Sequence, residues 1–259
     1  GALTLDGDSN DVAANVVPND SMTIASGVTL TSASDIILSA TTSGISAAGA
    51  LTLTAPSSIT LTGNLTAAGA VDLTANSGIT LNSNITTSSS SSLNIDANSS
   101  TLSLASGVVL SSAGALTLAA SNASSLGNLT LTSTGSTVNI NSALTSTGAV
   151  AMTANSGLNL NNIALTGAGN ITLQGGTGLT LASGMGITSS AGSITLGALG
   201  GTIAANGALT LSSNDSITVS NTFTSAGAAT LNANSGISIG TNFTANGAVA
   251  IDADLDDNG

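Results

Sequence analysis

The feature that most constrains this chain is a sequence repeat with a period of about 20 residues. The stretch GAVDLTANSGITLNSNIT, residues 69–86, restates GALTLTAPSSITLTGNLT, residues 49–66. At that offset the aliphatic positions coincide, pairing Leu51 with Val71, Leu53 with Leu73, Ile59 with Ile79, Leu61 with Leu81 and Leu65 with Ile85. Between them apolar and polar residues alternate, which is typical of half-buried strands. The turn segments APSS and ANSG also coincide, so strands and turns recur in register.

A short period of this kind predicts a solenoid. One unit cannot bury enough apolar surface to offset its loss of conformational entropy, whereas stacked units share a continuous core and a hydrogen-bonded backbone. Helix is disfavoured, because Ser, Thr, Asn and Gly fill the polar positions and the hydrophobic period is two. We therefore predict an all-β fold, a right-handed parallel β-helix of about 12 or 13 coils with about 20 residues per coil.

A second, longer period relates three parts of the chain. TANSGITL with Asn76 returns as TANSGLNL with Asn155 and NANSGISI with Asn234, at two equal steps. These asparagines are predicted to lie in turns and to form a polar ladder along the outside. Because the longer period is close to four times the shorter one, each super-repeat is predicted to make four coils. The prediction is one solenoid domain over residues 1–259, in which one extra coil precedes super-repeats at about 21–98, 99–177 and 178–259.

The charge composition excludes several classes of protein. The chain has no Lys, Arg or His and carries 12 aspartates, for a net charge of −12. Nucleic acids and anionic membrane surfaces attract cationic side chains, so neither is an expected partner. Apolar runs are interrupted after one to three residues, so no membrane insertion is expected. Lyase chemistry needs a basic residue to accept a proton, and the chain has none. The scattered inner aspartates do not favour paired-carboxylate hydrolysis, so we predict that the protein is not an enzyme.

Seven of the aspartates gather near the two chain ends. They are Asp6, Asp8 and Asp11 in DGDSND, and Asp252, Asp254, Asp256 and Asp257 in DADLDDNG. Alternate aspartates on a turn can direct several oxygens at a hard cation, which predicts calcium at a junction between subunits. The alternative is that these are solvated charges that oppose unwanted stacking at an exposed sheet edge.

The two ends also resemble each other in sequence. GAVAIDADLDDNG at one end and GALTLDGDSND at the other read as the same kind of coil, and both are similar to LNIDANSS around Asp96. If the last coil of one copy stacks on the first coil of another, a head-to-tail homo-oligomeric filament results. Calcium between facing carboxylates would relieve their repulsion. The alternative is a covalent continuation within a longer polypeptide.

The pattern GAVDLTANSGITLNSNI, with its short period, resembles the repeat region of filamentous haemagglutinin-like exoproteins. These are the large secreted β-helical adhesins of two-partner secretion systems. The resemblance extends over nearly the whole chain and rests on composition and period. It implies a β-helical rod located outside the cell or on its surface, with an adhesive role.

Three functions follow as expectations. The first is an extracellular structural protein, the subunit of a head-to-tail filament or surface layer, and the second is the stalk of a large secreted adhesin. The third, ice binding, needs sustained Thr-x-Thr ranks, but Thr52 and Thr62 are followed one coil later by Asp72 and Asn82.

One aromatic pair carries a separate prediction. The spacing between Phe223 and Phe243 equals one expected coil. The longer period relates Phe223 to Leu144 and to Leu65. We predict that the two rings stack in the core, in the column that contains Leu65.

Overall fold

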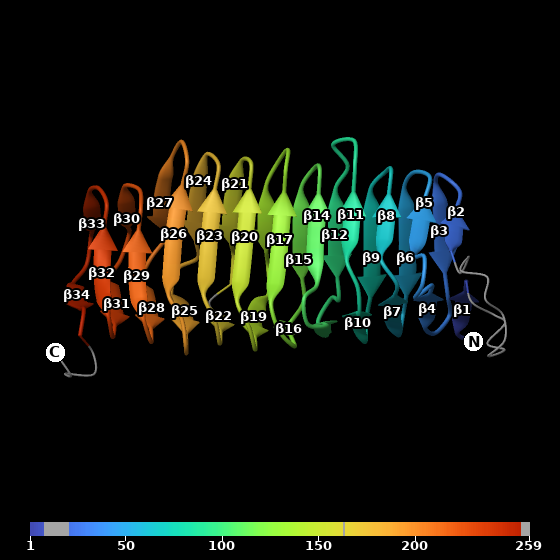
Figure 1. The fold of residues 1–259 in the computed structure, drawn as a ribbon, viewed down its shortest axis with the longest axis horizontal. Coiled ribbons are helices and arrows are strands. Elements are labelled where there is room, and N and C mark those ends of the chain that lie inside the picture. Colours follow the sequence, from blue (N-terminus) through green and yellow to red (C-terminus); the bar gives the residue numbers. More distant parts are fainter. Residues whose placement is uncertain (8–20, 163, 255–259) are drawn as a thin grey trace.

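The chain winds into an all-β parallel solenoid of about 11 turns, with about 21 residues per turn (Figure 1). The computed structural model describes residues 1–7, 21–162 and 164–254. Within these ranges every regular element is a strand, and no helix is long and apolar enough to cross a membrane. The strands form three parallel sheets, and each full turn of the chain contributes one strand to each sheet.

The three sheets run the length of the rod. The first sheet contains β1 (Leu3–Asp6), β4 (Ile36–Ser39), β7 (Ser58–Thr62), β10 (Gly78–Leu81), β13 (Thr101–Leu104), β16 (Asn122–Ser125), β19 (Ala143–Ser146), β22 (Ala164–Gly167), β25 (Met185–Ser189), β28 (Leu209–Ser213), β31 (Ala229–Ala233) and β34 (Val249–Asp252). The second contains β2 (Met22–Ile24), β5 (Ile45–Ala47), β8 (Leu65–Ala67), β11 (Ile85–Thr87), β14 (Val109–Ser112), β17 (Leu129–Ser133), β20 (Val150–Ala154), β23 (Ile171–Gly175), β26 (Ile194–Ala198), β29 (Ser216–Val219) and β32 (Gly236–Ile239). The third contains β3 (Val28–Thr31), β6 (Leu51–Ala55), β9 (Val71–Ala75), β12 (Leu93–Asp96), β15 (Leu116–Ala119), β18 (Val138–Ile140), β21 (Gly157–Leu160), β24 (Gly178–Leu181), β27 (Thr202–Ala205), β30 (Phe223–Ser225) and β33 (Phe243–Ala245).

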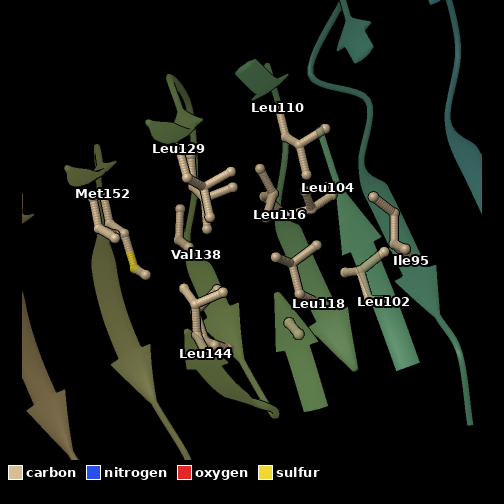
Figure 2. Packing of buried hydrophobic residues seen from close by; sticks show 14 of the residues in the cluster. Ile95, Leu102, Leu104, Leu110, Leu116, Leu118, Leu129, Val138, Leu144 and Met152 are labelled. Atoms are coloured by element: carbon tan, nitrogen blue, oxygen red, sulfur yellow. The ribbon is translucent and has the colours of Figure 1, made fainter. Parts of the chain in front are cut away.

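The alternating sequence gives each strand one buried and one outer face. In β6, for example, Leu51, Leu53 and Ala55 are buried and the threonines between them are half-buried. The buried side chains of all three sheets meet in one hydrophobic cluster that extends from Ile24 to Ala233. Figure 2 shows leucines of successive turns, with Val138 and Met152, projecting into this shared interior. Stacking thus supplies the core that a single turn lacks.

The predicted register between neighbouring turns is confirmed. All five aliphatic pairs found from the short period are partners in adjacent strands, as in Leu51 with Val71 and Ile59 with Ile79. Elsewhere turns are longer, as where Ile187 pairs with Leu211. The described chain therefore makes about 11 turns, fewer than the 12 or 13 expected from a constant short period.

The predicted four coils per super-repeat are wrong. The repeated Asn-Ser-Gly segments lead into β10, β21 and β32, so each super-repeat spans eleven strands. Eleven strands in three sheets are three turns and two thirds, because a turn averages about 21 residues and is longer than the short period. Equivalent sequences consequently lie on the first, third and second sheet in turn. The same sequence can form any of the three faces.

The eleven-strand super-repeat also changes the column to which the aromatic pair belongs. Phe223 and Phe243 stack as predicted, with ring centroids 4.5 Å apart and an interplanar angle of 14°. They lie in β30 and β33 of the third sheet, however, whereas Leu65 lies in β8 of the second sheet. The assumed column was wrong, because a super-repeat is not a whole number of turns.

Candidate self-association surfaces at the two ends

The end of the solenoid formed by β32, β33 and β34 leaves part of its apolar interior uncovered. Val249 and Ile251 of β34 are each 49% exposed. Their partners one turn earlier, Ala229 and Leu231, are fully buried. Phe243 in β33 is only partly buried. These side chains face the core, but among the described residues no further turn covers them, whereas the interior turns are covered on both sides.

The opposite end, formed by β1, β2 and β3, is similarly unfinished within the described residues. Leu5, Met22 and Leu30 pack against the core but are only partly buried. They line a hollow of ≈ 700 Å³. This end therefore has a recess where the other end has exposed apolar side chains.

The end strands also present unpaired sheet edges. In the part of the chain that the structure describes, β1, β2 and β3 begin the three sheets and β34, β32 and β33 end them, so each has a single neighbouring strand. The outer edge of an end strand exposes backbone donors and acceptors that another parallel strand can satisfy. Each end of the rod therefore combines apolar surface with three strand edges that pair with no further described strand.

The predicted calcium ligands are only partly placed. Asp6 ends β1 and Asp252 ends β34, at opposite ends of the rod (Figure 1). The backbone N–H of Asp254 donates to the Asp252 carboxylate at 3.3 Å. Asp8, Asp11, Asp256 and Asp257 lie outside the described residues. No group of three potential metal ligands occurs among the described residues, and calcium stays a prediction.

The three equivalent asparagines lie in turns but differ in their contacts. Asn76 accepts a hydrogen bond from the Asn98 side chain at 2.7 Å, and Asn234 donates to Asn214 at 3.0 Å. Asn155 instead lines a surface hollow of ≈ 580 Å³ beside Leu199. Two of the three thus contact an asparagine of a neighbouring turn.

Sequence reasoning missed a second set of asparagines that connect turns. The side-chain oxygens of Asn64, Asn84, Asn128 and Asn170 each accept from a backbone N–H of the following turn, at 2.8 to 3.1 Å. All four precede a strand in the pattern Asn-Leu-Thr or Asn-Ile-Thr. That recurrence is the signal that could have identified them.

Buried serines form another connection between turns. Ser133, Ser146 and Ser189 occupy inward positions at strand ends, and their hydroxyls donate to glycine carbonyls one turn earlier at 2.6 to 2.8 Å. Ser142 is also buried, but its hydroxyl has no hydrogen-bond partner among the described residues. The hydrogen bonds of the other three serines satisfy their hydroxyls and connect successive turns.

Among the aspartates that the structure describes, Asp35 accepts the most hydrogen bonds from its neighbours. The Ser58 hydroxyl donates to its carboxylate at 2.6 Å and the Ser58 N–H at 3.0 Å, and the Ser34 hydroxyl donates at 3.1 Å. These hydrogen bonds, led by the Ser58 hydroxyl, hold the pKa of Asp35 well below its ordinary value. The carboxylate joins the first sheet's β4 region to β7, and its role is structural.

The outer face of the first sheet carries one sustained rank of hydroxyls. Eight successive turns place a Thr or Ser in register, namely Thr60, Thr80, Ser103, Ser124, Thr145, Thr166, Thr188 and Ser212. The rank beside it breaks after Thr62, where Asn82 follows and donates to the Thr62 hydroxyl. The paired ranks expected of an ice-binding surface are therefore not continuous on this face.

No family model, curated protein or solved structure matches the chain. The parallel β-solenoid agrees with a β-helical repeat protein. Membership of the haemagglutinin-like family stays a prediction. The function proposed below therefore rests on the geometry of the two ends.

Proposed function

We propose that this protein is an extracellular structural rod that polymerises head to tail through its two solenoid ends. The observation that supports the proposal is the unfinished core at both ends. Exposed Val249 and Ile251 at one end, and the hollow beside Leu5 and Met22 at the other, would both be covered by a further turn. Covering them buries apolar surface and completes three strand ladders.

A second copy of this chain fits those requirements. It supplies parallel strands in three sheets, with the same spacing and the same alternation of inward and outward residues. The terminal strands even resemble each other, since GALTLD at β1 returns as GAVAID at β34. Because the two interacting surfaces differ and lie at opposite ends of the rod, the contact repeats along the rod axis and gives a filament.

The rest of the chain suits exposure outside the cell. Most of its apolar side chains are buried in a continuous core, and hydrogen bonds from asparagine and serine side chains connect its turns at the corners. The absence of Lys and Arg leaves no site for trypsin-like proteases. The resemblance to haemagglutinin-like exoproteins supports the same location.

Electron microscopy of the purified chain tests this proposal. We expect filaments of uniform width, and we expect Val249→Asp combined with Ile251→Asp to abolish them by placing charge in the joint. Thr86→Asp, on the exposed outer face of β11 in the middle of the rod, is the matched control and should polymerise. Single rods of the unmodified chain at all concentrations would contradict the proposal.

The second candidate is a stalk segment of a longer adhesin. It is favoured by the return of the β1 sequence at β34, on the same sheet, because a repeating polypeptide would continue in this way. In that protein the next turn is covalent and binding activity resides elsewhere. Single rods in the experiment above would favour this candidate.

A further inference from the structure

We infer that each copy in the filament is rotated by one third of a turn relative to the copy before it, so that β1 of one copy pairs with β32 of the preceding one. This inference rests on the proposed head-to-tail filament and specifies its register. Two independent observations support it. One is the order of the strands at the two ends, and the other is the position of two aspartates.

The order of the described strands permits only one junction without gaps or overlap between them. Successive strands enter the first, second and third sheet in turn, and β34 lies in the first. The next strand in space therefore belongs on the second sheet, over β32. If β1 of the next copy takes that place, β2 follows over β33 and β3 over β34.

The unrotated alternatives both disrupt the stack. Placing β1 over β34 leaves one strand missing from each of the other two sheets at the junction. Placing β2 directly over β32 instead makes β1 occupy the position of β34. A missing strand leaves backbone groups on both sides without partners in an otherwise continuous ladder.

The rotated junction matches apolar residues in all three sheets. If the ladders continue in register, the inward pairs are Leu3 with Ile237, Leu5 with Ile239, Met22 with Phe243, Ile24 with Ala245, Val28 with Val249, and Leu30 with Ile251. The pair of Met22 and Phe243 brings a thioether beside an aromatic ring, which is a favourable contact. Each inward-facing residue of β32, β33 and β34 in these pairs gains an apolar neighbour.

The charges at the outer face favour the same junction. Without rotation, β1 over β34 sets Asp6 directly beside Asp252, at the ~4.8 Å spacing of adjacent strands. Like charges in that position are destabilising. With rotation Asp6 lies beside Gly240, and Asp252 lies beside the exposed hydroxyl of Thr31. The rotated junction therefore separates Asp6 from Asp252, whereas the unrotated junction requires a cation such as the predicted calcium between them.

Disulfide trapping can distinguish the two registers, because the chain has no cysteine of its own. Thr4, Ser238 and Ala250 are exposed outer-face residues. Thr4→Cys combined with Ser238→Cys places the two thiols on neighbouring strands in the rotated junction, within the ~4.4–6.8 Å Cα separation that a disulfide spans. Thr4→Cys combined with Ala250→Cys does so in the unrotated junction and is the matched control.

Both double variants are assembled under mild oxidation with a calcium chelator and resolved on non-reducing gels beside electron micrographs. On the gel we expect a ladder of covalent oligomers from Thr4→Cys with Ser238→Cys and monomers from the control. In the micrographs we expect filaments with an axial rise of about 54 Å per subunit, or eleven and a third turns. Filaments that ladder only in the control, or in neither variant, overturn the rotation and leave the proposed function standing. Absence of filaments with and without added calcium overturns both.

Discussion

Phe223 and Phe243 stack face to face across one turn of the third sheet, with their ring centroids 4.5 Å apart. Phe223 is fully buried, whereas Phe243, on the last turn, is only partly buried. The two residues occupy the same column and differ only in whether a further turn covers them. Burial in this protein is therefore set by position along the rod as much as by residue type.

That difference gives the first prediction. Phe223→Ala removes a ring from the closed core and is expected to lower the free energy of unfolding by about 3–5 kcal/mol. Phe243→Ala is the matched control and is expected to cost less, because its ring is already partly in water. Urea unfolding followed by circular dichroism measures both. Equal losses in the two variants would show that the last turn is as enclosed as the interior.

Acid sensitivity should depend on Asp35. Its pKa is lowered in the folded state, chiefly by the Ser58 hydroxyl, so the ionised carboxylate stabilises the fold at pH values above its unfolded pKa of about 3.9. That contribution is lost as the pH falls from there toward the folded pKa. Asp35→Asn is expected to lower the melting temperature at pH 7, and the difference from the unmodified protein should shrink below about pH 4.

Asp72→Asn is the control for that experiment. Asp72 also lies on an outer sheet face, but its carboxylate accepts no hydrogen bond among the described residues. Melting temperatures from pH 2 to pH 8 should therefore separate the two variants. A difference for Asp35→Asn that stays constant down to pH 2 would show that the hydrogen bonds do not depend on its charge.

The buried serines make the third prediction. Ser133→Ala leaves the Gly114 carbonyl without the hydroxyl that donates to it at 2.6 Å, and is expected to cost about 1–3 kcal/mol. Ser142→Ala is the matched control, since its buried hydroxyl has no partner in the described part of the chain and its removal should raise the free energy of unfolding. Urea midpoints compare the two. A loss of stability in Ser142→Ala would indicate a hydrogen bond formed in solution.

The fourth prediction concerns a glycine at which the backbones of two successive turns approach closely. A Cβ at Gly176 would overlap the carbonyl oxygen of Asn155, one turn earlier, so Gly176→Ala is expected to destabilise the fold by about 1–3 kcal/mol. At Gly157 the nearest atom, of Asn159, would be 3.7 Å from an added Cβ. Gly157→Ala should therefore be neutral or stabilising by up to about 1 kcal/mol. Thermal unfolding distinguishes them, and equal effects would refute the steric argument.

The sequence predicts the local structure well because each coil repeats the spacing of apolar residues and turns of the coil before it. Leu51 over Val71 and Leu65 over Ile85 follow from alternation and spacing alone. The super-repeat could not be placed in the same way, because turn length varies and a small error accumulates over several turns. From the sequence, the junction residues at the two ends were predicted to be aspartates. The structure instead points to Val249, whose exposure the sequence cannot show, because it depends on whether another turn stacks over it.

The last prediction concerns the removal of one eleven-strand super-repeat. Deleting residues 77–155 joins Asn76 to Ser156, so that β21 takes the place of β10 on the first sheet. Leu158 then meets Ile59 as Ile79 does in the full chain. The shortened chain should fold into a rod shorter by three turns and two thirds, about 18 Å. Small-angle X-ray scattering measures its length against the full chain, and an unfolded or aggregated product would show that the three sheets are not interchangeable.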